Sequence, residues 1–420
     1  MSKNARDRRP NVKPVTRIEL SESNTKLRWI LIVVLLSIAV VSIVVGLMSL
    51  LNTEPGWQAV EVSSDQANCG SDFSLMYDFS EAGSAATAQY KQLTSLYSEA
   101  AVNGYRIFTP DVLEEGLYNV AYLNAHINET VMVDETLYRA LELVLEYSDR
   151  HVFTAPAMME YNRVFLCEND AEAAIYDPAR NPEMVEWLAE LAAYVNDPEM
   201  ISLEVLGENR VRLNVADAYL TFAEENEIEI FLDFSWMTNA FLADYLADVL
   251  IQNGYTNGYL ASYDGFTRNL DDRGQTYAVN IFDIQEQVIY MPTRMYYSRP
   301  MSIVFLRNYP MDELDRWHYF AFESGEVVTA FLDPTDCMSR SATDNLVSYS
   351  TEYSCAEILL QTAPLFIVET FDTNSVNALT ESGIYSIWFE DWTQKYNDAS
   401  IVLEANEDGG AALYTCSLEK

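Results

Sequence analysis

The residues of this chain that could do chemistry are carboxylates, and two of them flank the start of a helix predicted near the middle of the sequence. Asp233 and Asp244 lie in residues 232–268, LDFSWMTNAFLADYLADVLIQNGYTNGYLASYDGFTR, where the pattern predicts a strand end, a turn, a helix and a second strand. In a chain with 64 acidic residues, solvation at the surface is the ordinary role of any one of them. The sequence has no G-x-S-x-G, P-loop, H-E-x-x-H or C-x-x-C motif, and its three histidines are isolated, so those hydrolase, nucleotide and zinc chemistries are not indicated.

The elements that must position these acids are helices and antiparallel strands. In the central helix Phe241, Tyr245 and Val249 share one face, and Gly254 is a suitable stop because glycine adopts the left-handed conformation at little cost. The same periodicities predict further helices over 85–101, 137–147, 183–195, 357–365 and 377–383, and strands over 73–79, 201–205, 210–213, 277–283, 287–291, 301–306, 317–322, 327–332, 384–389 and 401–404. Long helices mixed with antiparallel strands predict an α+β domain.

Several short segments along residues 69–391 carry a recognisable pattern. Asp233-Phe-Ser-Trp-Met-Thr-Asn-Ala-Phe-Leu-Ala-Asp244 is similar to D-L-G-G-I-A-K-G-Y-A-x-D. Leu123-Asn-Ala125 is similar to the L-N of a second motif, and Ala330-Phe-Leu-Asp-Pro-Thr335 to H-I-I-D-P-R-T-G. Weaker matches lie at 69–71, 131–134, 148–161, 254–265 and, to A-D-A-L-A-T, at 355–361. In this order and spacing, the segments resemble the FAD:protein FMN transferases, the ApbE family.

The resemblance implies an ApbE-like α+β fold of mixed antiparallel sheet and helices. In a complete site it also implies Mg²⁺-dependent transfer of FMN from FAD to a threonine of a partner protein. Such chemistry depends on positioning and on charge neutralisation, and Mg²⁺ prefers oxygen ligands. The site residues that the resemblance assigns are Asp264 and Asp333 as catalytic acids, Asp233, Ser235, Trp236 and Asn239 as cofactor-binding residues, and Glu357 and Gln361 as metal ligands.

This chain departs from the family pattern where flavin chemistry is most demanding. Ser235-Trp236 replaces a glycine pair that lets the backbone approach a pyrophosphate, and an indole occupies much of the space that a ligand would need. The other departures are Asn239 for Lys, Ala330 for His, Glu357 for Asp and Gln361 for Thr. We therefore expect a degenerate relative that acts as a binding or assembly module. The alternatives are an active transferase with an altered site, and an unrelated hydrolase or glycan-binding surface protein.

An uncharged run of 23 residues, 29–51, is predicted to anchor the chain in the cell membrane. As a helix it would be about 35 Å long, enough to cross a hydrocarbon core of roughly 30 Å; a cleaved signal peptide is the rival interpretation. Residues 1–28 hold eight Lys or Arg against three acids, so this tail is expected in the cytoplasm and the large domain outside. We expect a juxtamembrane linker at 52–65 and one extracytoplasmic domain at 66–420.

Charge and cysteine content bear on the partners and on the covalent structure. A net charge of −39 repels nucleic acid, so the expected partners are the membrane and another surface protein. Among the five cysteines, Cys337 and Cys355 form the pair easiest to imagine as a disulfide, and the sequence leaves the connectivity open.

Overall fold

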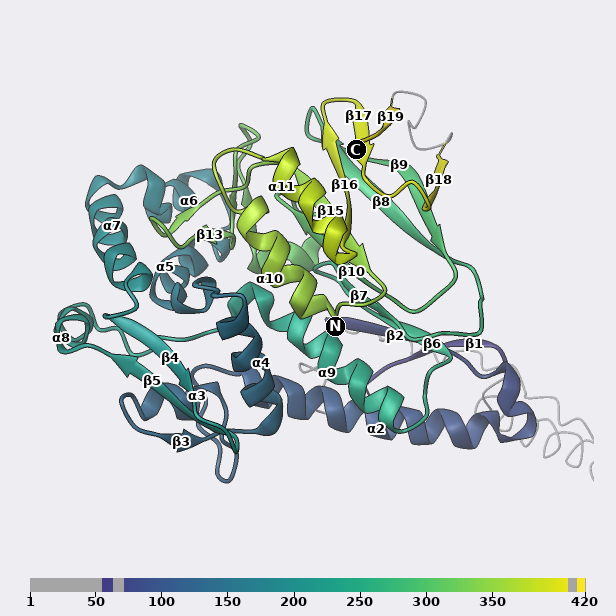
Figure 1. Cartoon of the computed structure of the whole chain (residues 1–420). Helices are drawn as coiled ribbons and strands as arrows, with labels where there is room; N and C mark the ends of the chain where they lie inside the picture. Colours follow the sequence, from purple (N-terminus) through teal and green to yellow (C-terminus); the bar gives the residue numbers. More distant parts are fainter. Residues whose placement is uncertain (1–54, 63–71, 407–413, 420) are drawn as a thin grey trace, which may run out of the picture. The chain divides into compact units, whose positions relative to one another are not determined.

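Nine strands form the central sheet in a computed structural model, which describes residues 55–62, 72–406 and 414–419 (Figure 1). All neighbouring strands of this sheet pair antiparallel except the last two, which pair parallel. From edge to edge the strands are β1 (Trp57–Val60), β2 (Phe73–Asp78), β6 (Gly258–Ser262), β7 (Phe266–Asn269), β10 (Met301–Arg307), β15 (Asn345–Ser350), β16 (Tyr385–Glu390), β17 (Thr393–Tyr396) and β19 (Thr415–Leu418).

Smaller sheets surround the central one. A three-stranded sheet consists of β18 (Val402–Ala405), β9 (Val288–Tyr297) and β8 (Tyr277–Gln285), and another of β3 (Val131–Met132), β5 (Arg210–Val215) and β4 (Ile201–Val205). Two short ribbons pair β11 (Tyr319–Ala321) with β12 (Val327–Thr329), and β13 (Leu332–Asp333) with β14 (Met338–Ser339).

Alternate residues of the central strands face two different layers, as the two-residue period of a strand requires. In β10, Met301 and Ile303 join a small core with β8 and β9, whereas Val304 and Leu306 join the main core. Two helices, α9 (Thr238–Gln252) and α10 (Cys355–Phe366), cover the main-core face, where they contact β6, β7, β10 and β15 (Figure 1).

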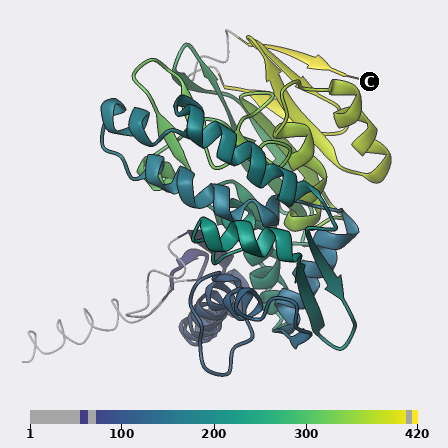
Figure 2. The ribbon, with the colours of Figure 1, turned by 90° about the vertical axis from the view of Figure 1, so that its left-hand side faces the viewer.

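The remaining helices complete the main core. Those formed by residues 120–225 gather on one side of the central sheet (Figure 1, Figure 2). The helices are α2 (Ala86–Phe108), α3 (Val120–Ala125), α4 (Glu135–Glu146), α5 (Ala155–Phe165), α6 (Asp170–Tyr176), α7 (Pro182–Asn196), α8 (Asp217–Glu225) and α11 (Thr373–Ala378). Gly104 allows α2 to lie close to α9, because a Cβ there would be 2.6 Å from Cδ2 of Leu242.

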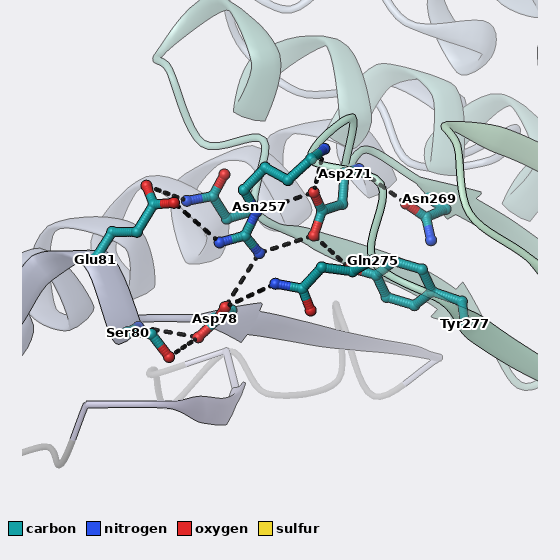
Figure 3. A network of polar contacts seen from close by, with 9 residues as sticks. Asp78, Ser80, Glu81, Asn257, Asn269, Asp271, Gln275 and Tyr277 are labelled. Atoms are coloured by element: carbon teal, nitrogen blue, oxygen red, sulfur yellow. Dashed lines mark hydrogen bonds and ion pairs between the residues drawn. The ribbon is translucent and has the colours of Figure 1, made fainter.

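An ion cluster centred on Arg273 ties the end of β2 to the β7–β8 connection. Its partners Asp78, Glu81 and Asp271 are labelled in Figure 3. The guanidinium lies 2.8 Å from Asp271, 3.1 Å from Asp78 and 3.4 Å from Glu81, and the hydroxyl of Tyr277 donates to Asp271 at 2.5 Å. Asp271 is fully buried. Burial alone would raise the pKa of Asp271, but the hydrogen bonds from Arg273 and Tyr277 outweigh it and hold that pKa below its ordinary value.

Most predicted elements are present, and the mixed α+β architecture is confirmed. The strand predicted at 327–332 is instead two strands, because β12 pairs with β11 whereas β13 pairs with β14. Part of the predicted linker at 52–65 is also a strand, β1, and Pro55–Lys420 make up one compact unit.

Two expectations concern the membrane and the cysteines. None of the helices in the described part of the chain is long and apolar enough to cross a membrane. Residues 1–28 and the run 29–51 lie outside the described residues.

Cys337 and Cys355 are both buried free thiols, so the structure does not form the disulfide suggested from sequence. The Cys355 thiol instead donates to the carbonyls of Thr267 and Ile303. Cys69 lies outside the described residues.

Candidate functional site

The turn before α9 is held by segments that are distant in sequence. The side-chain amide of Asn124 donates to the carbonyl of Leu232 at 2.9 Å and accepts from the backbone N–H of the same residue at 3.0 Å. The next residue, Asp233, donates its backbone N–H to the carbonyl of Val152 at 2.9 Å. Three of the segments that resemble the flavin transferases, those at 123–125, 148–161 and 233–244, therefore meet at this turn.

The turn keeps a glycine-like backbone without a glycine. Ser235 has a φ of +47°, a left-handed conformation that costs a non-glycine residue about 1–2 kcal/mol. Its backbone N–H donates to Oδ1 of Asp233 at 3.0 Å. Burial raises the pKa of Asp233 to about 6, and the hydrogen bond from Ser235 opposes this rise only in part.

Trp236 fills the space beside this turn. Its indole is 5% exposed and packs edge-to-face on Phe331, with ring centroids 4.9 Å apart, and on His151 at 6.0 Å. The space that remains between Trp236, Asp264 and Phe331 is about 10 Å³, room for one water molecule at most. The region between the Asp233 turn and the strand that ends at Asp333 is thus packed with aromatic rings.

Asn239 and Asp264 do come together, and they face an open cavity. The amide of Asn239 donates to Oδ2 of Asp264 at 2.8 Å, and the hydroxyl of Tyr105 donates to Asp72 and lies 3.5 Å from Oδ1 of Asn239. Burial and the nearby Asp72 carboxylate raise the pKa of Tyr105, so its hydroxyl stays a donor. We call this space, of about 500 Å³ and lined by Asp72, Asn239 and Asp264 together with His318, the Asp264 cavity.

Asp333 does not join Asp264. Its carboxylate pairs with Arg340 at 3.1 Å and accepts from the hydroxyl and backbone N–H of Thr335, at 2.6 and 2.9 Å. These contacts close the loop between β13 and β14, and Asp333 is not among the described residues that line the Asp264 cavity. The arrangement suits a structural role for Asp333 rather than the predicted catalytic one.

The two predicted metal ligands both form hydrogen bonds within the protein. Oε2 of Glu357 accepts from the backbone N–H of Ser354 at 2.8 Å, which completes a capping box at the start of α10. The amide of Gln361 donates to the carbonyl of Glu357 at 3.0 Å and to the hydroxyl of Tyr147 at 3.4 Å. Within the described residues no group of three His, Cys, Asp or Glu side chains could hold a metal ion.

Asp244 occupies the N-terminus of α10. Its two oxygens accept from the backbone N–H groups of Cys355 and Ala356, at 2.9 and 2.8 Å, and from Arg268 at 2.8 Å. A helix N-terminus is the place where an anion such as a pyrophosphate binds most readily, and here a carboxylate of the protein takes it. A second cavity, of about 570 Å³, lies beside this point between α4, α9 and α10, and we call it the α10 cavity.

Sequence reasoning missed several residues that line the Asp264 cavity. Asp72 is distant in the chain from Asp315 and His318, and only the fold brings these residues beside Asp264. No local pattern in the sequence indicates this grouping, since each of these residues on its own has an ordinary surface or core role. The capping role of Glu357 did have a signal, because Ser354-Cys-Ala-Glu357 has the S-x-x-E spacing.

The described domain is similar in structure to solved flavin transferases. The ApbE protein of Thermotoga maritima superposes with a TM-score of 0.54 and 12% sequence identity, over 84% of this chain and 97% of that one. The flavin transferase ApbE of Vibrio cholerae gives a TM-score of 0.49 and 12% identity, over 82% of this chain and 95% of that one. No protein-family model and no curated protein sequence matches this chain. The similarity to the Thermotoga protein shows that the chain has the ApbE fold, as its motifs implied.

Proposed function

We propose that this chain is a membrane-anchored, extracytoplasmic protein in which the ApbE fold serves as a binding or assembly module rather than as a flavin transferase. The observation that carries the proposal is the buried indole of Trp236 between Phe331 and His151. A flavin cofactor that contacted the backbone of this turn would have to displace the indole from its packed position. Such a displacement costs about as much as truncating a core tryptophan, roughly 3–5 kcal/mol, before any ligand contact is made.

The charges nearby also support the loss of flavin chemistry. Asn239 is neutral where the related motif has a lysine, and its amide is already engaged with Asp264. Asp244, by contrast, matches the aspartate that ends the related motif, and it accepts from the first amides of α10.

Location and partner follow from the sequence. The apolar run 29–51 and the basic tail before it support a single-pass anchor with the domain outside the cell membrane. The strong negative charge disfavours nucleic acid and favours another surface protein as the partner of the module. Trypsin treatment of intact cells tests this orientation: the domain should be cleaved from outside, and protection until the cells are opened would contradict it.

The second candidate function is an active Mg²⁺-dependent transferase that moves FMN from FAD to a protein threonine. The ApbE fold and the carboxylate of Asp264 at an open cavity favour it. Both candidates are tested by incubating the full chain with FAD, Mg²⁺ and a threonine acceptor protein, with the flavin transferase of Vibrio cholerae as the positive control. We expect no covalent flavin on the acceptor and no saturable FAD binding; transfer, or tight Mg²⁺-dependent FAD binding, would refute the binding-module proposal.

A restoring variant sharpens this experiment. Ser235→Gly combined with Trp236→Gly recreates the glycine pair and removes the indole from the turn. We expect measurable FAD binding in this variant and none in a control variant, Trp57→Gly, which removes an exposed indole on the edge strand β1. Equal behaviour of the two variants would show that Trp236 is not what excludes the flavin.

A further inference from the structure

One edge of the central sheet is the last strand of the described chain, β19. It pairs in parallel with β17 and with no other strand of the described residues (Figure 1). Parallel pairs are slightly less stable per residue than antiparallel ones, and an edge strand is paired along one side only. Thr415, Cys416 and Leu418 are exposed. The pairing alone therefore holds these four residues weakly.

The residue before β19 supplies the contacts that fix it in place. The ring of Tyr414 packs against Trp392 and Phe389, with ring centroids 5.1 and 5.6 Å apart. Its hydroxyl donates to Oδ2 of Asp283 at 2.8 Å. Because Asp283 belongs to β8, this contact joins the edge of the central sheet to the three-stranded sheet of β8, β9 and β18. Tyr414 therefore anchors β19 to both sheets.

Asp283 needs the hydroxyl that Tyr414 brings. The carboxylate is fully buried, and its other side-chain donors are the neutral amides of Gln285 at 2.9 Å and Asn345 at 3.0 Å. Burial raises the pKa of Asp283, and the hydrogen bonds from Gln285 and Tyr414 oppose that rise. If β19 left its place, a buried acceptor would lose one of its donors. This edge therefore favours occupation by a strand that carries a tyrosine in the position of Tyr414.

The rest of the strand is matched to the edge of β17. The backbone N–H of Glu419 donates to the carbonyl of Tyr396 at 2.8 Å. The hydroxyls of Thr393 and Thr415 lie 3.1 Å apart, and Nζ of Lys395 lies 3.7 Å from the Glu419 carboxylate. We call this place the β17 acceptor edge; it consists of β17 with Phe389, Trp392 and Asp283.

From these contacts we infer that the β17 acceptor edge of one copy of the chain binds the C-terminal strand of a second copy, residues 414–419, in exchange for its own. Every copy carries the same strand and the same edge, so the exchange is reciprocal and closes a two-fold pair. A second copy fits better than an unrelated peptide, because Tyr414, Thr415 and Glu419 each meet a complementary group on the edge. The inference goes beyond the proposed function, since the acceptor edge shares no residue with the turn at Asp233.

The competitor of the second copy is the chain's own strand. Seven residues, 407–413, join the part of the chain that contains β18 to Tyr414. A strand on so short a connection has an effective concentration in the millimolar range. Exchange is therefore favoured where copies are concentrated, as they would be when anchored side by side in one membrane. The net charge of −39 makes copies repel one another, so we expect exchange to increase with salt.

Disulfide trapping between two differently tagged copies of the full chain tests the inference. One copy carries Thr393→Cys and the other Thr415→Cys, and both carry Cys416→Ser to remove the exposed native thiol. These two positions are paired across β17 and β19, so a disulfide between copies requires that the strand of one lies on the edge of the other. We expect a cross-linked species that carries both tags, in an amount that rises with protein concentration over about 0.1–1 mM.

Two controls define the result. A single chain with both Thr393→Cys and Thr415→Cys should close internally, which shows that the geometry permits the bond. Val402→Cys in place of Thr415→Cys measures random collision, because Val402 is 60% exposed on β18, which pairs with β9. A doubly tagged species that is absent at about 1 mM, or that forms equally with the Val402 control, would overturn the inference.

A conservative change at the anchor separates exchange from a general loosening of the domain. Tyr414→Phe keeps the ring and removes the hydrogen bond to Asp283. In the copy with Thr393→Cys it weakens only the strand that must leave, so the mixed disulfide should form about 3–10-fold faster. In the copy with Thr415→Cys it weakens the strand's contacts before and after exchange alike, so the rate should not rise. An equal gain in both arrangements would show loosening alone and would refute the exchange.

Discussion

Replacing Trp236 with alanine is expected to destabilise the domain by about 3–5 kcal/mol, the usual cost of truncating a buried tryptophan. The side chain is only 5% exposed, so almost all of its transfer free energy is lost with it. Its edge-to-face contacts with Phe331 and His151 each add about 0.5–1.5 kcal/mol beyond burial. The space beside the indole is only about 10 Å³, so the site is already filled by side chains. Removing the indole therefore creates a new cavity.

Urea unfolding of the full chain, followed by far-ultraviolet circular dichroism, measures this loss as a fall in the transition midpoint. Trp317→Ala is the matched control, because that indole is 52% exposed and its removal should cost less than about 1 kcal/mol. Equal midpoints for the two variants would refute the claim that Trp236 fills a packed site, and the strongest argument against flavin binding would go with it.

Three further changes have defined outcomes. Burial raises the pKa of Asp233 from 3.8 to about 6, so between these pH values the folded state retains a proton that the unfolded chain releases. The free energy of unfolding therefore falls, on the order of 3 kcal/mol, as the pH rises from about 4 to 6. Asp233→Asn should remove this fall, which is measured by comparing the urea midpoints at pH 4 and 7. Ser235→Gly should stabilise the fold by about 1 kcal/mol because its φ of +47° suits glycine, and an unchanged or lower thermal midpoint would contradict this. Arg273→Ala should cost about 3–5 kcal/mol at pH 7, because it leaves the buried Asp271 without its cation. Since the pKa of Asp271 is held below its ordinary value, that loss should shrink as the pH falls below about 4, and a loss that does not depend on pH would argue against the ion cluster as its cause.

Elements with a clear period were predictable from the sequence, and those without one were not. The helix α9 was predicted because Phe241, Leu246 and Leu250 recur on its buried face, and Gly254 follows it with a φ of +80°. The strand β15, Asn345–Ser350, was missed because all six of its residues are buried, so polar and apolar residues do not alternate along it.

The site was predictable only where it is local in sequence. Asp233, Ser235 and Trp236 adjoin one another in the chain, and the departures from the glycine pair indicated a filled turn. The Asp264 cavity depends on the fold, which brings Asp72 and His318 to the same space, and no periodicity encodes such a meeting. The resemblance assigns Glu357 to a metal through its place in the motif, whereas its spacing from Ser354 indicates a capping box, which satisfies two backbone groups at the start of α10.

The Arg273 cluster has a mechanical consequence. A pull on the chain at residue 55 reaches the domain first through β1, a four-residue edge strand, and then through β2. Arg273 holds Asp78, the last residue of β2, and Glu81 just beyond it, to the connection between β7 and β8. β1 is the edge strand and is paired with β2, whereas β2 is held by β1, by β6 and, at its last residue, by the ion pair with Arg273. A pull at residue 55 is therefore expected to separate β1 from the sheet before β2.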